Sequence, residues 1–203
     1  MQRQMSSEYD KVKHRRLRHH FIAAWLRSPL KMGAVLPSSR SLARAMAAQI
    51  DTAREGSIIE VGAGTGMVTQ ALLEADIPRE RVLVIERDKK LFGLLHAIFS
   101  NLKVVCEDAS ELEKVICKYG MGKVNAIVSS LPFITMPVAV RHSIQEQMAK
   151  VIGDDGIIIQ FTYGHKSPIS YSEMKKYGLT GRRVKMVFMN VPPAHVWVYR
   201  KDI

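Results

Sequence analysis

Ile58-Ile59-Glu60-Val61-Gly62-Ala63-Gly64-Thr65-Gly66 joins a short apolar run, interrupted by one acid, to three glycines at alternate positions. Glycine has no Cβ, so such a turn can adopt left-handed backbone angles and let the chain approach a ligand closely. A second apolar run ends in Glu86, twenty residues after Gly66, and an acid at the end of a strand suits a pair of ribose hydroxyls. Together these features predict a nucleoside-bearing cofactor on the first two strands of an α/β sheet.

The spacing of the glycines narrows the choice of cofactor. The dinucleotide fingerprint is G-x-G-x-x-G, whereas the third glycine here comes one position early and Met67 stands where the fingerprint needs glycine. No G-K-[ST] follows, which excludes a phosphate-binding P-loop. With the acid Glu60 before the first glycine, E-V-G-x-G-x-G resembles the first motif of class I S-adenosylmethionine-dependent methyltransferases. The alternative is an ordinary glycine-rich turn, and the position of Glu86 argues against it.

Length and composition bound the class of protein. The chain has 203 residues, enough for one α/β domain with an N-terminal extension, and its 47% hydrophobic content supports a packed core. Cys106 and Cys117 form neither a disulfide framework nor a zinc pattern, which fits a reducing cytosol. The sequence predicts no metal site, no transmembrane segment and no signal peptide. We therefore expect a cytoplasmic protein.

The net charge of +11 is unevenly distributed. Residues 1–31 contain eight Lys and Arg against two acids, and a second basic cluster lies further on, at Lys175, Lys176, Arg182, Arg183 and Lys185. This pattern predicts an anionic partner, either a membrane surface or a nucleic acid. Charge alone does not decide between the two.

Residues 8–27 are predicted to form a basic amphipathic helix, which Ser28-Pro29 ends. Its apolar sector carries aromatic side chains toward the end, a pattern typical of a segment that lies in a membrane interface. The alternative is a helix that packs its apolar side on the domain and exposes its charges to water. The membrane interpretation assigns lipid contact to seven residues, Arg15, Arg16, Leu17, Arg18, Phe21, Trp25 and Leu26.

The rest of the chain alternates strands and helices after a helix expected over residues 40–50. Strands are expected over 57–61, 81–86, 102–105, 124–129 and 157–161, separated by helices over 66–75, 88–99, 110–118 and 137–152. Two more strands, 183–190 and 195–200, are too close for a helical crossover and should form an antiparallel hairpin at one edge. We predict a Rossmann-like α/β fold with a mostly parallel seven-stranded sheet over residues 38–203, preceded by the membrane-binding helix and a cap loop over 1–37.

Ligands of open α/β sheets bind outside the carboxyl ends of the strands. In class I methyltransferases an acid after the third strand often holds the adenine amino group, and Asp108 resembles it. The alternative roles are a helix N-cap for Asp108 and a solvated strand end for Glu86. Reading the strand ends in order gives the expected cofactor-binding residues Glu60, Gly62, Gly64, Gly66, Glu86, Arg87, Asp108, Ala109 and Ser129.

The turn after the fourth strand bears on the acceptor. Enzymes that methylate adenine or cytosine amino groups usually carry [D/N/S]-P-P-[Y/F/W] there, which stacks the base and accepts from its exocyclic nitrogen. This chain has Ser130-Leu131-Pro132-Phe133, which keeps one proline and the aromatic residue but lacks the first proline. That departure argues against base methylation.

Several segments together resemble the small bacterial phospholipid N-methyltransferases of the rhizobial type, over nearly the whole chain. The segments are 25–30 (W-L-R-S-P-L), 33–40 (G-A-V-L-P-S-S-R), the glycine motif 60–66, 85–88 (I-E-R-D), 129–132 (S-S-L-P), 160–164 (Q-F-T-Y-G) and 192–199 (P-P-A-H-V-W-V-Y). The resemblance implies that phosphatidylethanolamine and its mono- and dimethyl derivatives are converted to phosphatidylcholine with S-adenosylmethionine. It also implies a peripheral enzyme, at the inner face of the cytoplasmic membrane, whose N-terminal helix docks on anionic lipid.

The acceptor in that reaction is an amine, which must lose a proton before its lone pair attacks. Tyr163 is the first candidate to orient it or accept from it, with Ser129 and Ser130 second; the alternative for Tyr163 is a packing role. His142, His165 and His195 are expected to be isolated and structural. Two other functions remain open: an rRNA adenine N6-methyltransferase-like enzyme whose basic residues contact phosphates, and a membrane-bound module that binds nucleoside without turnover.

Overall fold

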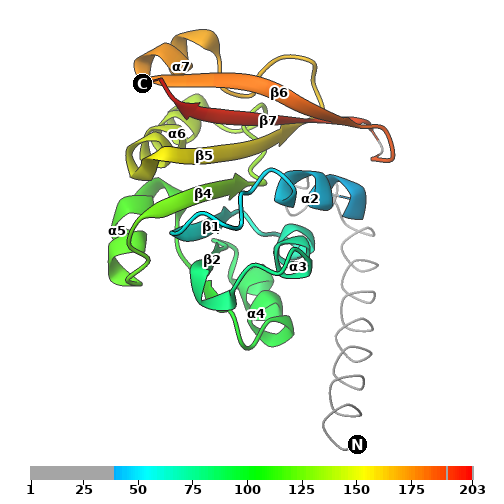
Figure 1. Ribbon diagram of the computed structural model, residues 1–203, viewed down its shortest axis with the longest axis vertical. Helices are drawn as coiled ribbons and strands as arrows, with labels where there is room; N and C mark the ends of the chain where they lie inside the picture. The colour runs from blue at the N-terminus through cyan, green and yellow to red at the C-terminus, as the bar shows by residue number, and fades with distance from the viewer. Residues whose placement is uncertain (1–38, 191, 203) are drawn as a thin grey trace, which may run out of the picture. The chain divides into compact units, whose positions relative to one another are not determined.

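The alternating strands and helices form a seven-stranded sheet in the order β3-β2-β1-β4-β5-β7-β6 (Figure 1). The computed structural model describes residues 39–190 and 192–202. The expected boundary between residues 37 and 38, and the expected amphipathic helix with its seven lipid-contact residues, lie outside this range and stay predictions. The elements are α2 (Arg40–Ala47), β1 (Ser57–Val61), α3 (Met67–Glu74), η2 (Arg79–Arg81), β2 (Val82–Ile85), α4 (Lys89–Ile98), β3 (Lys103–Val105), η3 (Ala109–Glu111), α5 (Leu112–Lys118), β4 (Val124–Ser129), α6 (Val138–Val151), β5 (Ile152–Thr162), α7 (Tyr171–Lys176), β6 (Leu179–Val187) and β7 (Ala194–Lys201).

All strands except β7 point the same way, because β7 is antiparallel to both β5 and β6. The predicted Rossmann-like, mostly parallel sheet with a C-terminal antiparallel hairpin is therefore confirmed. The hairpin inserts its more apolar strand into the sheet: Val196, Val198 and Tyr199 of β7 are buried, whereas β6 exposes Arg182 and Lys185. Charged side chains on an edge strand discourage pairing with another chain, so β6 suits the edge.

Helices cover both faces of the sheet, and the alternation of side chains along β1 separates the two layers. Ile59 and Val61 join one apolar cluster with residues of α5 and α6. Glu60 points to the opposite face, where its carboxylate meets Thr69 of α3, and α2 packs against α3. Figure 1 shows α2 and α3 on one side of the sheet and α5 and α6 on the other.

Three elements depart from the expected boundaries, and one of them is β5, which begins at Ile152 rather than at residue 157. Helix α7 was not predicted, although Ser170 and Glu173 form a capping box that the sequence S-x-x-E signals. Strand β6 begins at Leu179 rather than at residue 183, and residues 188–190 belong to a turn. The strand includes Gly181, whose missing Cβ leaves room for the ring of Tyr199 on β7. Because it contains a glycine and consecutive charged residues, β6 lacks the alternation of apolar and polar residues by which a strand is recognised in a sequence.

Candidate functional site

The register of the sheet brings the predicted cofactor residues to one edge. Val61 lies beside Ile85 on one side and beside Ser129 on the other. The Gly62 amide donates to the Ile85 carbonyl at 3.0 Å, and the Ser130 amide donates to the Val61 carbonyl at 3.0 Å. The glycine turn, Glu86 and the turn after β4 are therefore consecutive along the carboxyl edge.

The three glycines of the turn differ in why they must be glycine. All have positive φ, +71° at Gly62, +56° at Gly64 and +76° at Gly66, where a side chain is strained. A Cβ on Gly62 would lie 2.5 Å from Leu131 Cδ2, and one on Gly66 would lie 2.6 Å from Phe99 Cε2. A Cβ on Gly64 would meet nothing within 4 Å. Packing therefore requires the outer two glycines, while the central one faces open space, as a ligand-facing residue would.

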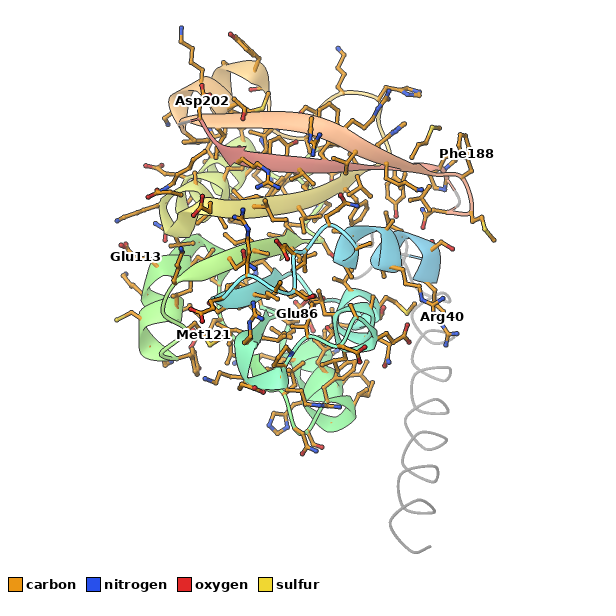
Figure 2. The ribbon with its side chains drawn as sticks, viewed as in Figure 1. Arg40, Glu86, Glu113, Met121, Phe188 and Asp202 are labelled. Atoms are coloured by element: carbon orange, nitrogen blue, oxygen red, sulfur yellow. The ribbon has the colours of Figure 1, made fainter. Side chains whose placement is uncertain are left out.

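Glu86 joins the turn to β2, and Figure 2 shows it at the centre of this edge. Its side chain is 8% exposed, with Oε2 accepting from the Gly64 amide at 2.8 Å and Oε1 accepting from the Asp88 amide at 2.9 Å. A carboxylate oxygen has two lone pairs, so each oxygen can accept once more. That remaining capacity matches the two donors of a vicinal diol. The alternative of a solvated strand end does not fit so buried a carboxylate.

Glu60 is fully buried on the α3 side of β1. Thr69 Oγ1 donates to its Oε2 at 2.7 Å, while Oε1 is buried without a partner. Burial raises the pKa of Glu60 to about 8, despite the Thr69 hydrogen bonds, and the nearby Glu86 carboxylate adds to the rise. With this pKa the carboxyl is protonated near pH 7, and because Oε2 accepts from Thr69, the unpartnered Oε1 carries the proton and is a donor.

Asp108 follows β3 and is the next acidic residue at this edge of the sheet. Its Oδ1 accepts from the Ser110 amide at 2.9 Å, and its Oδ2 lies 3.3 Å from Arg87 Nη1. Its partial burial works in the opposite direction, but the Ser110 hydrogen bonds and the Arg87 guanidinium hold the pKa of Asp108 below its usual range. Asp108 thus caps η3, as the alternative interpretation stated, and Oδ2 with the exposed Arg87 still faces the edge. Ala109, the first residue of η3, is buried beside it.

Buried side chains hold the turn after β4 in place. Ser129 is fully buried, and its Oγ accepts weakly, at 3.4 Å, from the Leu131 amide, while Ser130 is half-buried. Gln160 of β5 donates to the Leu131 carbonyl at 2.9 Å. Phe133 is only 1% exposed and belongs to the apolar core. The aromatic ring that would stack a nucleobase is therefore committed to packing.

Tyr163 follows β5 at the same edge and is half-buried. Its ring packs edge-on against Phe161, with centroids 5.4 Å apart. Burial raises the pKa of the Tyr163 hydroxyl, and a hydrogen bond with the Asn190 side chain partly offsets the rise. Asn190 is 2% exposed; its Oδ1 accepts from the Ser39 amide at 2.9 Å and its Nδ2 donates to the Pro192 carbonyl at 2.8 Å. Asn190 is a site residue that the sequence analysis missed, since only the fold brings the β6–β7 turn to Tyr163.

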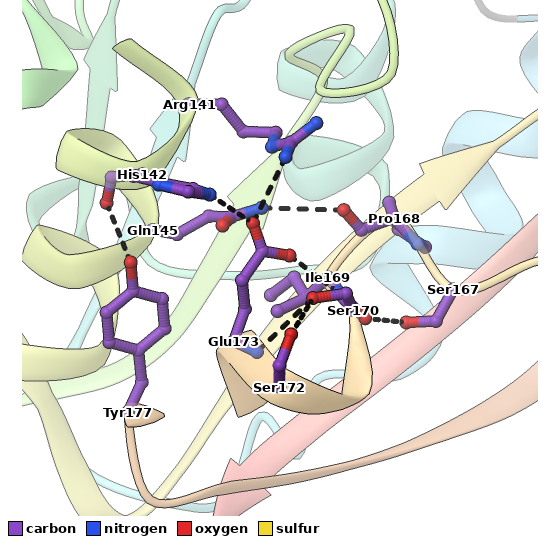
Figure 3. Close-up of polar contacts among 10 residues, drawn as sticks. All are labelled: Arg141, His142, Gln145, Ser167, Pro168, Ile169, Ser170, Ser172, Glu173 and Tyr177. Atoms are coloured by element: carbon purple, nitrogen blue, oxygen red, sulfur yellow. Dashed lines mark hydrogen bonds and ion pairs between the residues drawn. The ribbon is translucent and has the colours of Figure 1, made fainter. Parts of the chain in front are cut away.

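The expectation that three histidines are isolated is wrong. His142 Nε2 lies 2.6 Å from Glu173 Oε1, which Arg141 Nη2 also contacts at 3.2 Å (Figure 3). The rings of His165 and His195 lie 5.1 Å apart. Burial, then the charges of Arg183 and His165, lower the pKa of His195. Sequence reasoning missed these contacts because every partner lies on a different element.

The Glu173 cluster ties α6 to α7 and to the loop between β5 and α7. Glu173 Oε2 accepts from the Ser170 amide at 2.7 Å, completing the capping box of α7. Nearby, Gln145 donates to the Pro168 carbonyl at 3.4 Å and the Tyr177 hydroxyl donates to the His142 carbonyl at 3.3 Å. Figure 3 shows Arg141 and His142 directed at Glu173, with Gln145 and Tyr177 bonded to backbone carbonyls beside them, so we interpret the cluster as structural.

Within the part of the chain that the structure describes, no three His, Cys, Asp or Glu side chains are placed to hold a metal ion. In the same residues, no helix has the length and apolar character needed to cross a membrane.

Comparison with known proteins places this geometry in a class. No family profile matches the sequence. The chain is 27% identical over 185 residues to an ornithine lipid N-methyltransferase of Singulisphaera acidiphila, covering 89% of this chain and 94% of the relative. It is 30% identical over 95 residues to ribosomal RNA small subunit methyltransferase A of a Hydrogenobaculum species, covering 47% of this chain and 35% of that protein.

Solved structures share the architecture at low sequence identity. A Burkholderia thailandensis 1,6-didemethyltoxoflavin-N1-methyltransferase, solved with its substrate and S-adenosylhomocysteine, superposes with a TM-score of 0.62 at 14% identity, covering 97% of this chain and 90% of its own. The magnesium protoporphyrin IX methyltransferase of Synechocystis, solved with S-adenosylmethionine, gives 0.58 at 13% identity over 79% of this chain and 76% of its own. The fold of this chain is that of the class I S-adenosylmethionine-dependent methyltransferases.

Proposed function

We propose that the chain transfers methyl groups from S-adenosylmethionine to the amine of a membrane lipid head group. Phosphatidylethanolamine and its mono- and dimethyl derivatives are the acceptors, and phosphatidylcholine is the product. The observation that carries the proposal is the match to a lipid N-methyltransferase along 89% of this chain and 94% of the relative. The enzyme works as a peripheral protein on anionic lipid at the inner face of the cytoplasmic membrane.

Ornithine lipid is the second candidate acceptor, because the printed name of that relative specifies it. Both candidates present an amine on a lipid head group, and the chemistry at the amine is the same. They differ in the charge near the amine, because the ethanolamine group is linked to a phosphate and the ornithine amine is not. Only a direct comparison of the two lipids assigns the acceptor.

An RNA acceptor is the weaker alternative. The ribosomal RNA methyltransferase resembles only 47% of this chain, and the turn after β4 lacks the first proline of the base-methylating motif. The buried Phe133, 1% exposed, has no free face for a base. A non-catalytic nucleoside-binding module is the other alternative; the ligand-facing Gly64 and the buried Glu86 suit a cofactor in either case, so turnover is what separates the two.

The proposed chemistry requires few protein groups. The donor supplies a methyl group that an amine lone pair attacks in line, so the protein must align the two and exclude water. Glu86 holds the ribose, Asp108 and Ala109 border the adenine, and the protonated Glu60 ties β1 to α3 through Thr69 behind the glycine turn. Because burial raises the pKa of Tyr163, its hydroxyl stays neutral near pH 7 and orients the amine by accepting a hydrogen bond. Ser130 is the second orienting candidate, with the buried Ser129 behind it.

The test offers labelled S-adenosylmethionine to the full-length protein with four samples: phosphatidylethanolamine vesicles, ornithine lipid vesicles, RNA and no acceptor. We expect label in phosphatidylethanolamine, in a product that chromatographs as its N-methyl derivatives. Label in ornithine lipid alone assigns the second candidate, and label in RNA alone overturns the proposal. Absence of label from all samples, with S-adenosylmethionine bound, supports the non-catalytic alternative.

A further inference from the structure

The large apolar side chains that remain exposed gather at the carboxyl edge of the sheet. Single exposed apolar residues are ordinary, so their clustering is what matters. Among the described residues, five are exposed, and four of them lie in the segments that follow β4 and β6: Ile134, Val138 at the start of α6, Phe188 and Met189. We call these four the apolar rim. Phe188 and Met189 are the most prominent, at 72% and 81% exposure.

The rim borders the proposed active site. Strand β6 runs parallel to β1, β2, β4 and β5, so its end, like theirs, lies at the cofactor edge. Between β4 and β6 stand β5 and β7, which separates the two rim loops by about 14 Å at ordinary strand spacing. The loop after β5 fills this interval: a Cβ on Gly164, next to Tyr163, would touch Ile134 Cδ1 at 3.7 Å. The rim thus lies on both sides of Tyr163.

The β6–β7 turn holds its two apolar residues outward. The Asn190 amide donates to the Val187 carbonyl at 3.4 Å, closing a tight turn around Phe188 and Met189. The Asn190 side chain is anchored by Ser39 and Pro192. Figure 2 shows Phe188 at the tip of the hairpin, at the end opposite to Asp202. An anchored turn with two exposed apolar side chains at its tip presents them to something other than water.

The charges beside the rim indicate which kind of partner would contact it. The basic residues beside the rim are Lys166 in the loop after β5 and Arg182, Arg183 and Lys185 of β6, whereas Arg141 is paired with Glu173. Within residues 39–190 and 192–202, Arg182, Arg183 and Lys185 of β6 are exposed and have no carboxylate within 4.0 Å. The acids of this edge, such as Glu86 and Asp108, follow β2 and β3 on the other half of the sheet. The rim half is apolar and basic, which complements an anionic lipid surface.

We propose that the apolar rim is a membrane-contact surface of the methyltransferase domain itself. Phe188 and Met189 enter the head-group region of an anionic bilayer, while Arg183 and Lys185 face lipid phosphates. A nucleic acid would use the same cations and could stack on Phe188, but Ile134, Val138 and Met189 offer it neither an aromatic face nor a hydrogen bond, whereas a bilayer buries all four side chains. The inference rests on the proposed lipid substrate for its purpose: this orientation turns Tyr163 toward the head groups.

The first experiment locates the bilayer directly. Full-length protein carrying Cys106→Ser and Cys117→Ser receives one cysteine, Phe188→Cys or the control Tyr171→Cys, labelled with an environment-sensitive dye. Tyr171 is a matched control because it is 79% exposed and starts α7, which lies at the other end of the hairpin (Figure 1). We expect a blue shift at position 188, and none at 171, with phosphatidylglycerol–phosphatidylethanolamine vesicles. An unshifted dye at 188 on vesicle-bound protein, or a shift with RNA in place of vesicles, overturns the inference.

The second experiment separates membrane contact from chemistry. Phe188→Ser/Met189→Ser is compared with Tyr171→Ser for binding to the same vesicles and for methylation of short-chain phosphatidylethanolamine dispersed as monomers. The double variant lacks the two apolar side chains that enter the bilayer. We therefore expect vesicle binding to weaken by about tenfold or more in the double variant only. Methylation of dispersed lipid should be unchanged. Equal vesicle binding by both variants contradicts the inference and leaves the proposed function standing. If no lipid is methylated by the parent protein, the proposed function fails, and the dye shift still decides the inference.

Discussion

The amide of Gly64 donates a 2.8 Å hydrogen bond to Oε2 of Glu86. This bond joins the turn after β1 to the acid that follows β2, although the two residues lie 22 positions apart in the chain. The carboxylate both fixes the turn and faces the cofactor edge, so its orientation is set before any ligand arrives. Such preorganisation lowers the entropic cost of binding.

Replacement of Glu86 tests whether this carboxylate and the glycine turn bind the cofactor. Glu86→Ala removes the acceptor of the expected ribose hydroxyls, and hydrogen bonds to a charged group contribute about 1.5–3 kcal/mol each. We expect affinity for S-adenosylhomocysteine, measured by isothermal titration calorimetry, to fall by about tenfold or more. Glu80→Ala, an exposed acid just before the other end of β2, should bind as the parent does. Full affinity in Glu86→Ala would show that the cofactor lies elsewhere.

Two glycines of the same turn should respond differently to alanine. Both have positive φ, so each substitution carries a backbone cost of about 1–2 kcal/mol. A Cβ on Gly66 also lies within 2.8 Å of Leu95 and Phe99, whereas a Cβ on Gly64 meets no atom within 4 Å. We expect Gly66→Ala to lose clearly more stability in urea unfolding, and Gly64→Ala to lose cofactor affinity out of proportion to its small loss of stability. Equal stability losses would contradict the packing argument.

The Glu173 cluster should contribute more stability than a surface pair. Glu173 accepts from Ser170 and pairs with Arg141 and His142, whose side chains are 22% and 39% exposed, so Glu173→Ala removes the capping-box acceptor and leaves a partly buried Arg141 unpaired, which should cost about 1–3 kcal/mol. Glu113→Ala breaks an exposed pair with Lys150, and we expect a cost below about 1 kcal/mol in the same urea titrations. Comparable losses in the two variants would refute the structural role.

The pH dependence of Glu173→Ala provides a second check. Burial opposes it, but the Ser170 hydrogen bonds and the neighbouring cations lower the pKa of Glu173. A lowered pKa contributes stability that is present above the unfolded-state value and is lost as the pH falls through the folded-state value. The stability gap between the parent and Glu173→Ala should therefore narrow as the pH falls below 4.5.

Most of the fold follows from local patterns. Strands buried on both faces, such as Ser57–Val61 and Val124–Ser129, read as continuous apolar runs, and proline or glycine marks the turns between elements. Edge strand β6 does not follow such a pattern, because only one side of an edge strand is selected for burial. Its boundaries and the short helix α7 depend on contacts with β7 and α6, which no local rule contains.

The cofactor half of the site was predictable for a related reason. Gly62, Gly64 and Glu86 sit at strand ends whose order the alternating pattern implies. Asn190 and the buried state of Phe133 were not predictable, since each depends on packing between segments distant in sequence. The glycine motif thus carries the proposed donor site, while the proposed acceptor side is assembled by tertiary contacts.

Glu60 predicts an unusual pH dependence of stability. Its carboxyl titrates near 4.5 when unfolded and at about 8 when folded, because burial disfavours the charge. Between these values the folded state binds more protons, so stability falls as the pH rises. Glu60→Gln cannot titrate, and we expect its stability relative to the parent to improve by about 3–5 kcal/mol between pH 5 and pH 8. Glu74→Gln, at the end of α3, is the control, and parallel pH profiles for Glu60→Gln and the parent would contradict the assignment.

Tyr163 and Asn190 should act as one unit in catalysis. Asn190 is held by Ser39 and Pro192 and hydrogen-bonds Tyr163, so it fixes the hydroxyl that orients the amine. We expect Tyr163→Phe to lower kcat on the methylated lipid by about tenfold or more, with the KM for S-adenosylmethionine unchanged. Asn190→Ala should lower kcat in the parent but not in the Tyr163→Phe background, because its effect passes through the hydroxyl. Tyr171→Phe, at an exposed position remote from the site, should leave kcat intact. Additive losses in the double variant would mean that Asn190 supports the fold rather than Tyr163.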